Sequence, residues 1–269
     1  PYPAIPDVFF AWPIAKLRHQ MIILDAFIPL HDTIVGDRAL VRGGGLTAKA
    51  IWALEWAALH LANVIISDTD QHGNFLAEEF RLDRRRIQTI LVGAEPIFRM
   101  PATQPSADLD LTEAVGKPII LFYGQLIPLH GLSTILDAIS RTAADPIHWV
   151  IVGRGQEERV LRDFIGQELP GNLRWIPWID YERLPAMIAR STVALGVFGT
   201  GAKSGRVIPN KLFQILAAGK PVITRASPAV DFLAEAYPQT LITVPAGDGA
   251  ALAAAARDAV AHPVKLRPL

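Results

Sequence analysis

Short apolar runs alternate with amphipathic segments along this chain, and that alternation is the strongest constraint on its fold. The apolar runs are rich in β-branched and aromatic residues: DVFFA (7–11), MIILD (21–25), NVIIS (63–67), PIILFYG (118–124), HWVIVG (148–153), STVALGV (191–197) and PVIT (221–224). Such runs are typical of strands in a parallel sheet that is covered on both faces. Helical spacing of apolar residues lies between them, over 47–62, 131–140 and 156–164. The repeated strand and helix order predicts an α/β fold with doubly wound parallel sheets.

The first of these helical segments is predicted to bury one stripe of side chains. Ile51, Leu54, Ala58 and Leu61 recur at the spacing of a single helix face. We therefore expect this stripe to face the core.

Composition excludes several classes of protein. With 269 residues, of which 51% are hydrophobic, the chain can bury a sizeable core and is not disordered. Its 26 basic and 26 acidic side chains balance, so no overall basic field favours nucleic acid. The absence of cysteine excludes disulfides, thiolate metal sites and thiol catalysis. Glu55 and His60 interrupt the longest apolar stretch, residues 51–66, which therefore does not read as a membrane span.

The regular pattern fails between Met100 and Lys117, where two prolines occur without a helical or strand period. We predict a linker over 101–117, between an N-terminal domain over 1–100 and a C-terminal domain over 118–269. Two full domains of this kind need more than 269 residues. The N-terminal domain is therefore expected to be incomplete, in keeping with a chain that begins at Pro1 instead of methionine.

Two glycine-containing segments follow predicted strands, where ligands bind in doubly wound folds. In YGQLIPLHG (123–131), Gly124 lets backbone amides approach an anion, and His130 can add a charge or a donor. The alternative is that its glycines serve only as turn residues. In VIVGRGQEE (150–158), Gly153 begins a Gly-x-Gly turn that lacks the third glycine of a dinucleotide fingerprint. A tight turn without a nucleotide remains the alternative there.

A third segment, residues 199–224, combines a flexible basic loop with a helix that is predicted to begin at Pro209 and stop at Gly219. Lys203, Arg206 and Lys211 would cluster at the N-terminus of that helix, an arrangement that favours a phosphate or diphosphate. Asn210 and Gln214 have the spacing of neighbours on one helix surface. The alternative is a solvated basic loop.

Weaker signals concern metals and aromatic residues. The pairs Asp68/Asp70 and Asp108/Asp110 have the spacing that holds a metal in some sugar transferases, but helix capping or a linker explains them more simply. The histidines lack zinc-ligand spacing, and we predict no metal site. Trp178 follows a predicted strand and either flanks a nucleotide base or belongs to the core.

The order of these motifs resembles glycosyltransferase family 4, whose members are two-domain nucleotide-sugar transferases of the GT-B type. The resemblance runs from about residue 62 to 235. It rests on NVIISDTDQHGNFLAEEFRLDRRRIQTILVGAEPIF (63–98), YGQLIPLHG, VIVGRGQ and NKLFQILAAGKPVI (210–223). It implies two Rossmann-like parallel-sheet domains, a nucleotide-diphosphate sugar bound mainly by the second, and transfer with retention and without a bound metal.

The resemblance also implies site residues. Asp25, Arg206 and Lys211 are the expected catalytic residues. The donor-binding residues would be Gly124, Gln125, His130, Gly153, Trp178, Lys203, Asn210 and Gln214. Asp25 or Asp32 lies closest to the place where the family has a histidine beside the transferred sugar, although a structural cap or turn explains either residue more simply.

Several of these positions depart from the family pattern. Gln125 and His130 replace an arginine and a lysine, and Arg206 and Gln214 replace the two glutamates of the Glu-x7-Glu motif. An amide donates and accepts hydrogen bonds, so Gln214 can keep the ribose role of the second glutamate. Arg206 cannot accept from sugar hydroxyls, but it can take over diphosphate charge.

The leading hypothesis is a retaining glycosyltransferase that moves a sugar from a nucleotide-diphosphate sugar to an envelope polysaccharide or glycolipid, with no cofactor and no nucleic acid. The expected location is cytoplasmic, with peripheral contact at the inner face of the membrane as an option. One alternative is a non-catalytic nucleotide-sugar-binding or scaffold module. Another is a nicotinamide-dependent oxidoreductase, which rests only on the generic strand and helix pattern.

Overall fold

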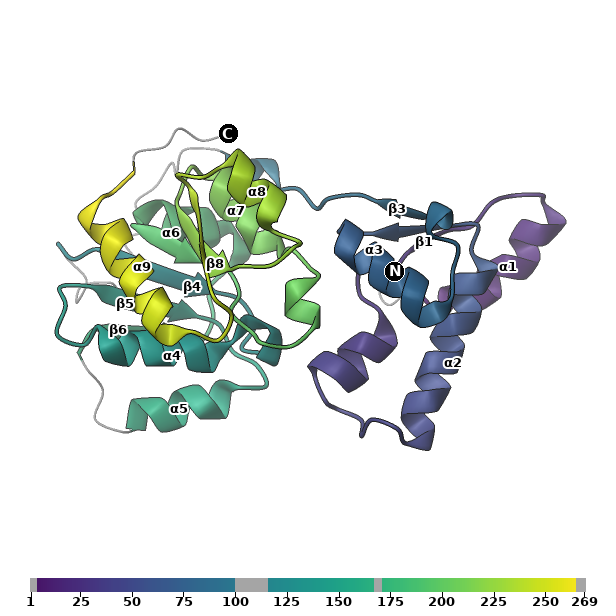
Figure 1. The fold of residues 1–269 in the computed structure, drawn as a ribbon, viewed down its shortest axis with the longest axis horizontal. Coiled ribbons are helices and arrows are strands. Elements are labelled where there is room, and N and C mark those ends of the chain that lie inside the picture. Colours follow the sequence, from purple (N-terminus) through teal and green to yellow (C-terminus); the bar gives the residue numbers. More distant parts are fainter. Residues whose placement is uncertain (1–3, 100–115, 167–170, 265–269) are drawn as a thin grey trace. The chain divides into compact units, whose positions relative to one another are not determined.

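The computed structural model describes residues 4–99, 116–166 and 171–264 (Figure 1). Contacts divide the chain into two compact units. The first comprises Pro1–Val92 with Gly205–Ile208, and the second comprises Gly93–Ser204 with Pro209–Leu269. Residues 101–115 of the predicted linker lie outside the described residues. The segment Gly205–Ile208 therefore belongs to the first unit, although the residues before and after it in the sequence belong to the second.

The first unit contains a small parallel sheet in the order β1, β2, β3. Its strands are β1 (Ile23–Asp25), β2 (Val64–Ser67) and β3 (Ile87–Thr89), and its helices are α1 (Asp7–Leu17), α2 (Leu46–Leu61) and α3 (Asp70–Phe80). A π-helical turn, η1 (Asp32–Asp37), and a 3-10 turn, η2 (Arg84–Arg86), complete it. Ile65 of β2 pairs in register with Leu24 and Ile87, and all three are buried. The central strand therefore anchors this core.

The prediction of a strand over DVFFA is wrong, because this run forms the first turns of α1. Pro6 occupies the N-cap and Asp7 the first turn, where a carboxylate interacts favourably with the helix dipole. The apolar character continues through Leu17 and gives α1 eleven residues, more than a buried strand of this kind needs. Only Val8 of the helix is buried. Aromatic and β-branched content alone could not distinguish the two states.

Helix α2 buries a face that only partly matches the predicted stripe: Ala58 is buried and Leu61 packs against the core, as predicted. Its buried residues are Ala48, Glu55, Ala58 and Leu59, whereas Leu54 is 39% exposed. Glu55 is fully buried, and its two carboxylate oxygens accept hydrogen bonds from the backbone N–H groups of Leu30 (2.7 Å) and His31 (2.9 Å). A charged residue thus occupies a core position because it satisfies backbone donors of the segment after β1.

We expect Glu55→Leu to destabilise the first unit by about 3 kcal/mol, because two backbone N–H groups lose their buried acceptor. Hydrogen exchange would show lost protection at the amides of Leu30 and His31. Lys49→Ala, an exposed change on the same helix, is the control and should leave exchange unchanged. Equal protection in Glu55→Leu and the parent chain would contradict this account.

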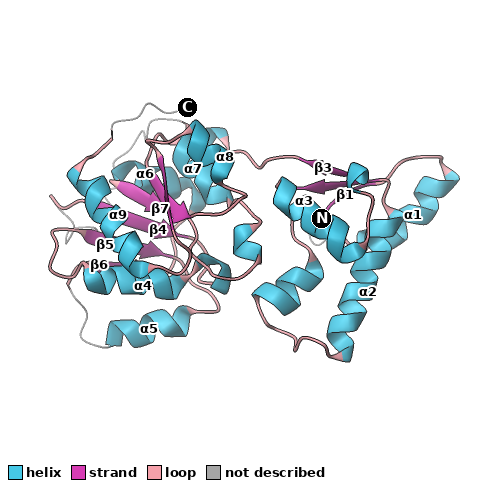
Figure 2. Ribbon diagram, viewed as in Figure 1, coloured by secondary structure: helices cyan, strands magenta, loops and turns pink. Residues whose placement is uncertain are grey.

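The second unit contains a six-stranded parallel sheet (Figure 2). Its strand order is β6, β5, β4, β7, β8, β9. This is the doubly wound order, in which successive strands are added on one side of β4 and then, from β7 onward, on the other side. The strands are β4 (Ile119–Tyr123), β5 (His148–Val152), β6 (Leu173–Ile176), β7 (Val193–Leu195), β8 (Val222–Arg225) and β9 (Leu241–Val244). Four of the predicted runs coincide with β4, β5, β7 and β8.

Helices cover this sheet and join its parallel strands. They are α4 (Leu132–Arg141), α5 (Glu158–Gly166), α6 (Leu184–Arg190), α7 (Asn210–Ala217), α8 (Asp231–Ala236) and α9 (Gly249–Ala261). The 3-10 turns are η3 (Pro96–Phe98), η5 (Pro128–His130), η6 (Tyr181–Arg183) and η7 (Lys203–Gly205). Every residue of β4 and β5 is buried, and α4 packs on α9. The predicted fold class, α/β with parallel Rossmann-like sheets, is confirmed.

Candidate functional site

A cavity of about 550 Å³ lies in the second unit, where β4, β5 and β6 end. Three groups of residues line it, one at the carboxyl end of each strand: Tyr123, Gly124 and Gln125; Val152, Gly153, Arg154 and Gly155; and Pro177, Trp178, Ile179, Tyr181 and Leu184. The carboxyl ends of parallel strands meet at one edge of a sheet, and ligands of doubly wound folds bind there. The fold therefore brings Gly124, Gln125, Gly153 and Trp178, four of the predicted donor-binding residues, to one cavity.

Backbone approach explains the two glycines of this cavity. Gly124 has a φ angle of 137° and Gly153 one of 139°, a backbone conformation that residues with a Cβ atom rarely adopt. A Cβ atom on Gly153 would lie 1.9 Å from the carbonyl oxygen of Gly124. The turns after β4 and β5 thus touch through backbone atoms, which leaves the adjoining space open.

We expect Gly153→Ala to destabilise the second unit by roughly 3 kcal/mol. The φ angle is unfavourable for alanine, and the added Cβ would clash with the carbonyl oxygen of Gly124. Thermal denaturation measures this loss. Gly171→Ala is the matched control, since an added Cβ there meets nothing within 4 Å. Equal melting temperatures for the two variants would refute the close-approach argument.

Trp178 is one of the residues that line the cavity. It is 68% exposed, so the core alternative does not describe it. The guanidinium carbon of Arg154 lies 5.6 Å from the centroid of its ring. An exposed indole beside a cation is suited to stacking with a planar group.

Lys211 lies beside the turn after β4. Its side chain is buried, and the amine lies 4.1 Å from the ring centroid of Phe122. A Cβ on Gly124 would lie 3.0 Å from this amine and 3.2 Å from Cε1 of His130. The amine has no hydrogen-bond partner among the described residues. Burial lowers the pKa of Lys211 to about 7, so the amine is partly neutral at physiological pH.

This burial predicts a pH-dependent stability. The unfolded lysine, with a pKa near 10.5, keeps its proton between about pH 7 and 10.5, where the folded one loses it. Stability of the parent chain therefore rises over that range. We expect Lys211→Met to be more stable than the parent at pH 6, and this difference to shrink by on the order of 2–3 kcal/mol at pH 9.

Chemical denaturation at the two pH values checks this expectation. Lys49→Met, at an exposed position of α2, is the control and should show a constant difference from the parent. A difference for Lys211→Met that does not change with pH would mean that its pKa is not lowered in the folded state.

A polar network surrounds Gln214, which is 7% exposed. Its Oε1 accepts from the hydroxyl of Tyr123 (3.1 Å), and its Nε2 donates to the hydroxyl of Tyr181 (3.1 Å) and to Oε2 of Glu95 (3.4 Å). The Tyr181 hydroxyl donates to Oε1 of Glu95 at 2.6 Å. Desolvation and this carboxylate raise the pKa of Tyr181 to about 12, while the hydrogen bond from Tyr181 lowers the pKa of Glu95.

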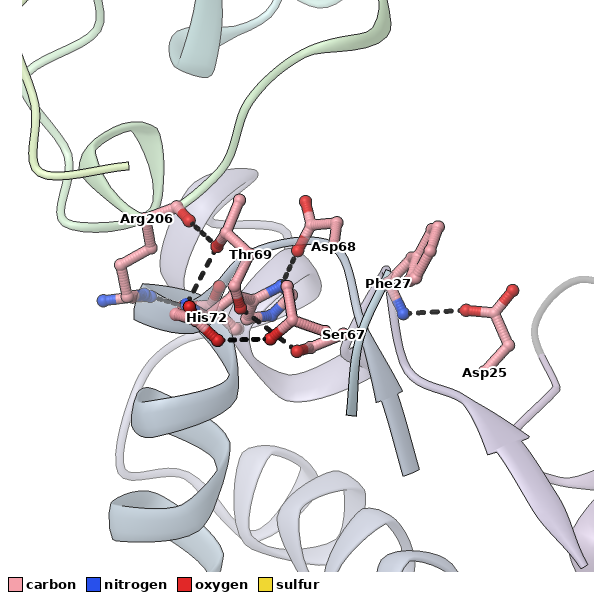
Figure 3. A network of polar contacts seen from close by, with 10 residues as sticks. Asp25, Phe27, Ser67, Asp68, Thr69, His72 and Arg206 are labelled. Carbon is pink, nitrogen blue, oxygen red and sulfur yellow. Dashed lines mark hydrogen bonds and ion pairs between the residues drawn. The ribbon is translucent and has the colours of Figure 1, made fainter. Parts of the chain in front are cut away.

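The predicted basic cluster is divided between the two units. Lys203 begins η7 and Lys211 lies in α7, both in the second unit, whereas Arg206 belongs to the first. The guanidinium of Arg206 pairs with Asp32 at 2.8 Å and lies 3.8 Å from the ring centroid of Phe75. Its carbonyl oxygen accepts from the hydroxyl of Thr69 (Figure 3).

The other predicted residues take local roles in the structure. The carboxylate of Asp25 accepts a hydrogen bond from the backbone N–H of Phe27 at 3.0 Å (Figure 3). This contact agrees with the alternative that Asp25 has a structural role in a turn. Nδ1 of His130 contacts the carbonyl oxygen of Gln125. Asn210 is exposed at the start of α7, which begins one residue after Pro209. The catalytic and donor-binding assignments stay predictions.

Near Arg206, the first unit holds a buried pair formed by His72 and Asp68 (Figure 3). Nδ1 of His72 lies 2.5 Å from Oδ1 of Asp68, which follows β2. The hydroxyl of Thr69 accepts from the backbone N–H of His72 and so caps α3. Capping by this segment agrees with the simpler explanation of the Asp68/Asp70 spacing.

The described residues contain neither a cluster of metal ligands nor a helix that could span a membrane. No group of three or more histidine, aspartate or glutamate side chains among them is placed to hold a metal ion. Asp108 and Asp110 lie outside the described residues. None of the helices described is both long and apolar enough to cross a bilayer. The expectation of a metal-independent site stays a prediction.

Sequence reasoning missed Glu95, Tyr123 and Tyr181. Tyr123 and Tyr181 lie next to motifs that were recognised, but neither has a spacing that marks a hydroxyl donor. Glu95 precedes the predicted linker, and its contacts place it with the second unit. The available signal was its position at the end of the 63–98 stretch, immediately before Pro96.

Comparison with known proteins identifies a family. The family described as glycosyl transferases group 1 matches residues 117–262, most of the second unit. The Escherichia coli protein WcaI, named for glycosyl transfer in colanic acid biosynthesis, is 31% identical over 157 residues. That match covers 58% of this chain and 38% of WcaI, so the chain spans much less than the full length of this relative.

Solved structures share the fold at low sequence identity. Sucrose-phosphate synthase from Thermosynechococcus elongatus has a TM-score of 0.74 and 20% identity, over 97% of this chain and 64% of that one. The Anabaena protein HepE, in a complex with UDP, has a TM-score of 0.75 and 11% identity, over 98% of this chain and 69% of that one. These similarities support the predicted GT-B type of fold.

Proposed function

Because the chain belongs to the group 1 glycosyl transferases, we propose that it takes part in sugar transfer from a nucleotide-diphosphate sugar to an envelope polysaccharide or glycolipid. The observation that carries this proposal is the cavity of the second unit, which combines two glycine turns with an exposed tryptophan. The similarity to WcaI favours a polysaccharide acceptor. The UDP bound to HepE favours a nucleotide donor.

The donor would lie across the ends of β4, β5 and β6. Trp178, with Arg154 beside it, offers a face for the base. Gly124 and Gly153 let the ligand approach the backbone without meeting a side chain. The volume of about 550 Å³ lies within the range of ligand cavities.

Lys211 would supply the positive charge that Gln125 and His130 no longer provide. Its amine lies against Gly124 and has no partner among the described residues. A diphosphate beside it would favour the charged form and raise its pKa again. As the bond between the sugar and the diphosphate breaks, this charge would stabilise the departing anion.

The remaining details of the proposal come from the family resemblance. They are retention at the anomeric carbon, a reaction without a metal, a cytoplasmic location at the inner face of the membrane, and an acceptor held mainly by the first unit. Asp25 follows β1 there and is exposed, so its carboxylate is accessible to an acceptor.

One observation favours the alternative of a non-catalytic nucleotide-sugar-binding module. Arg206 stands at the position of the first motif glutamate, and its charge is already paired with Asp32. If turnover is lost, the protein would bind donors without hydrolysing or transferring the sugar. Release of nucleoside diphosphate from the donor would exclude this alternative.

Isothermal titration with uridine, guanosine and adenosine diphosphates tests the donor assignment. At about pH 8, binding should take up roughly 0.5–1 proton, because the diphosphate raises the pKa of Lys211. Titrations in two buffers with different ionisation enthalpies measure that uptake. Lys211→Met should abolish the uptake and weaken binding about tenfold or more.

Lys220→Met is the matched control, because this lysine follows the same helix and donates to the carbonyl oxygen of Ser191. It should leave nucleotide affinity and proton uptake unchanged. No binding of any nucleotide by the folded chain would refute the donor assignment. Binding without proton uptake, and with equal affinity in Lys211→Met, would refute only the anion site.

A further inference from the structure

Gln214 occupies the position of the second motif glutamate, but its amide is already engaged. The Nε2 group has two hydrogens, and it donates to both Tyr181 and Glu95. The Oε1 atom accepts from Tyr123. The side chain is also almost fully buried. These contacts indicate that Gln214 holds Tyr123, Tyr181 and Glu95 in place and has little capacity left to bind a ligand.

Glu95 has the capacity that Gln214 lacks. Its side chain is exposed, and each carboxylate oxygen accepts one hydrogen bond from the network. An ionised carboxylate has about four acceptor sites, so each oxygen can accept one more. The hydrogen bond from Tyr181 lowers the pKa of Glu95, which keeps the carboxylate ionised at neutral pH.

The carboxylate is also held in a defined place. Phe98, at the end of η3, is buried and lies edge-on to the ring of Tyr181, with centroids 5.7 Å apart. The turn η3 packs against α7, which carries Gln214. Tyr181 lines the cavity and follows Trp178 in the same segment after β6. Glu95 is therefore fixed next to the cavity wall that carries the proposed base-stacking residue.

We propose that Glu95 is the carboxylate that accepts hydrogen bonds from the ribose hydroxyls of the nucleotide, with Tyr181 and Gln214 as positioning residues. A vicinal diol presents two donors, and a carboxylate offers two oxygens at matching separation. The proposal rests on the proposed nucleotide-sugar function. It replaces the missing motif glutamate by a carboxylate from another part of the chain.

The test compares ribonucleotides with 2′-deoxyribonucleotides on the full chain. Uridine, guanosine and adenosine diphosphates and their 2′-deoxy forms are titrated into the parent chain and into Glu95→Gln. We expect the parent to prefer the ribose form by about tenfold or more, because the deoxy form leaves an acceptor without its donor. In Glu95→Gln this preference should fall to about twofold or less, with little change for the deoxy form.

Two further variants separate positioning from a structural effect. Glu182→Gln, an exposed carboxylate in η6, is the matched control and should keep the full preference. Tyr181→Phe keeps the ring against Phe98 but removes the hydroxyl that holds Glu95, and should reduce the preference without abolishing binding.

The outcomes distinguish the two levels of the proposal. An unchanged ribose preference in folded Glu95→Gln would overturn the role of Glu95 and leave the donor assignment intact. A parent chain that binds nucleotides with no ribose preference would overturn it as well. A parent chain that binds none of the nucleotides would overturn the donor assignment and this inference with it.

Discussion

The buried amine of Lys211 is the constraint on which the second unit's site depends. Aromatic rings and the Gly124 backbone enclose it, and no described residue accepts a hydrogen bond from it. Taking an ammonium group out of water without a partner costs free energy, which appears as a lowered pKa. The core of α7, including Leu212 and Ile215, holds the lysine there despite that cost. Under the proposed function, an anion beside Gly124 would reduce this cost, and the burial of Lys211 would be coupled to ligand binding.

The central strands were predictable because their burial is complete. Residues of β4 and β5 are apolar on both faces, so the sequence period and the environment agree. The same rule failed for α1, where an apolar run lies mainly at the surface of the first unit and burial did not determine its structure. It also failed in part for the buried face of α2, because Glu55 is buried through hydrogen bonds to backbone donors distant in sequence. Such long-range polar contacts leave no periodic signal.

Site residues could be predicted from the sequence where only one residue type fits the local structure. Gly124 and Gly153 were recognisable because only glycine tolerates their φ angles and the approach of their backbones. Charged and amide side chains were harder, because each has several equivalent uses. Arg206 was predicted as a contact for the diphosphate, and its guanidinium pairs with Asp32 and lies against the ring of Phe75 within the first unit. Glu95 joins Gln214 only through tertiary structure, across 119 positions of sequence.

Two of the departures from the family motifs share one physical feature, whereas Arg206 reverses the charge of the first motif glutamate. Where the chain lacks the motif arginine and lysine, it buries Lys211 against the same glycine turn. Where it lacks the second glutamate, the carboxylate of Glu95, at the N-cap of η3, accepts a hydrogen bond from Gln214, the glutamine that stands there. In both places the sign of the charge is kept while its source moves to a different element. Drift after loss of function has no reason to preserve two such charges, one of them at the cost of burying an ammonium group. Under the proposed function, this pattern favours a site whose charges were relocated over one that has decayed.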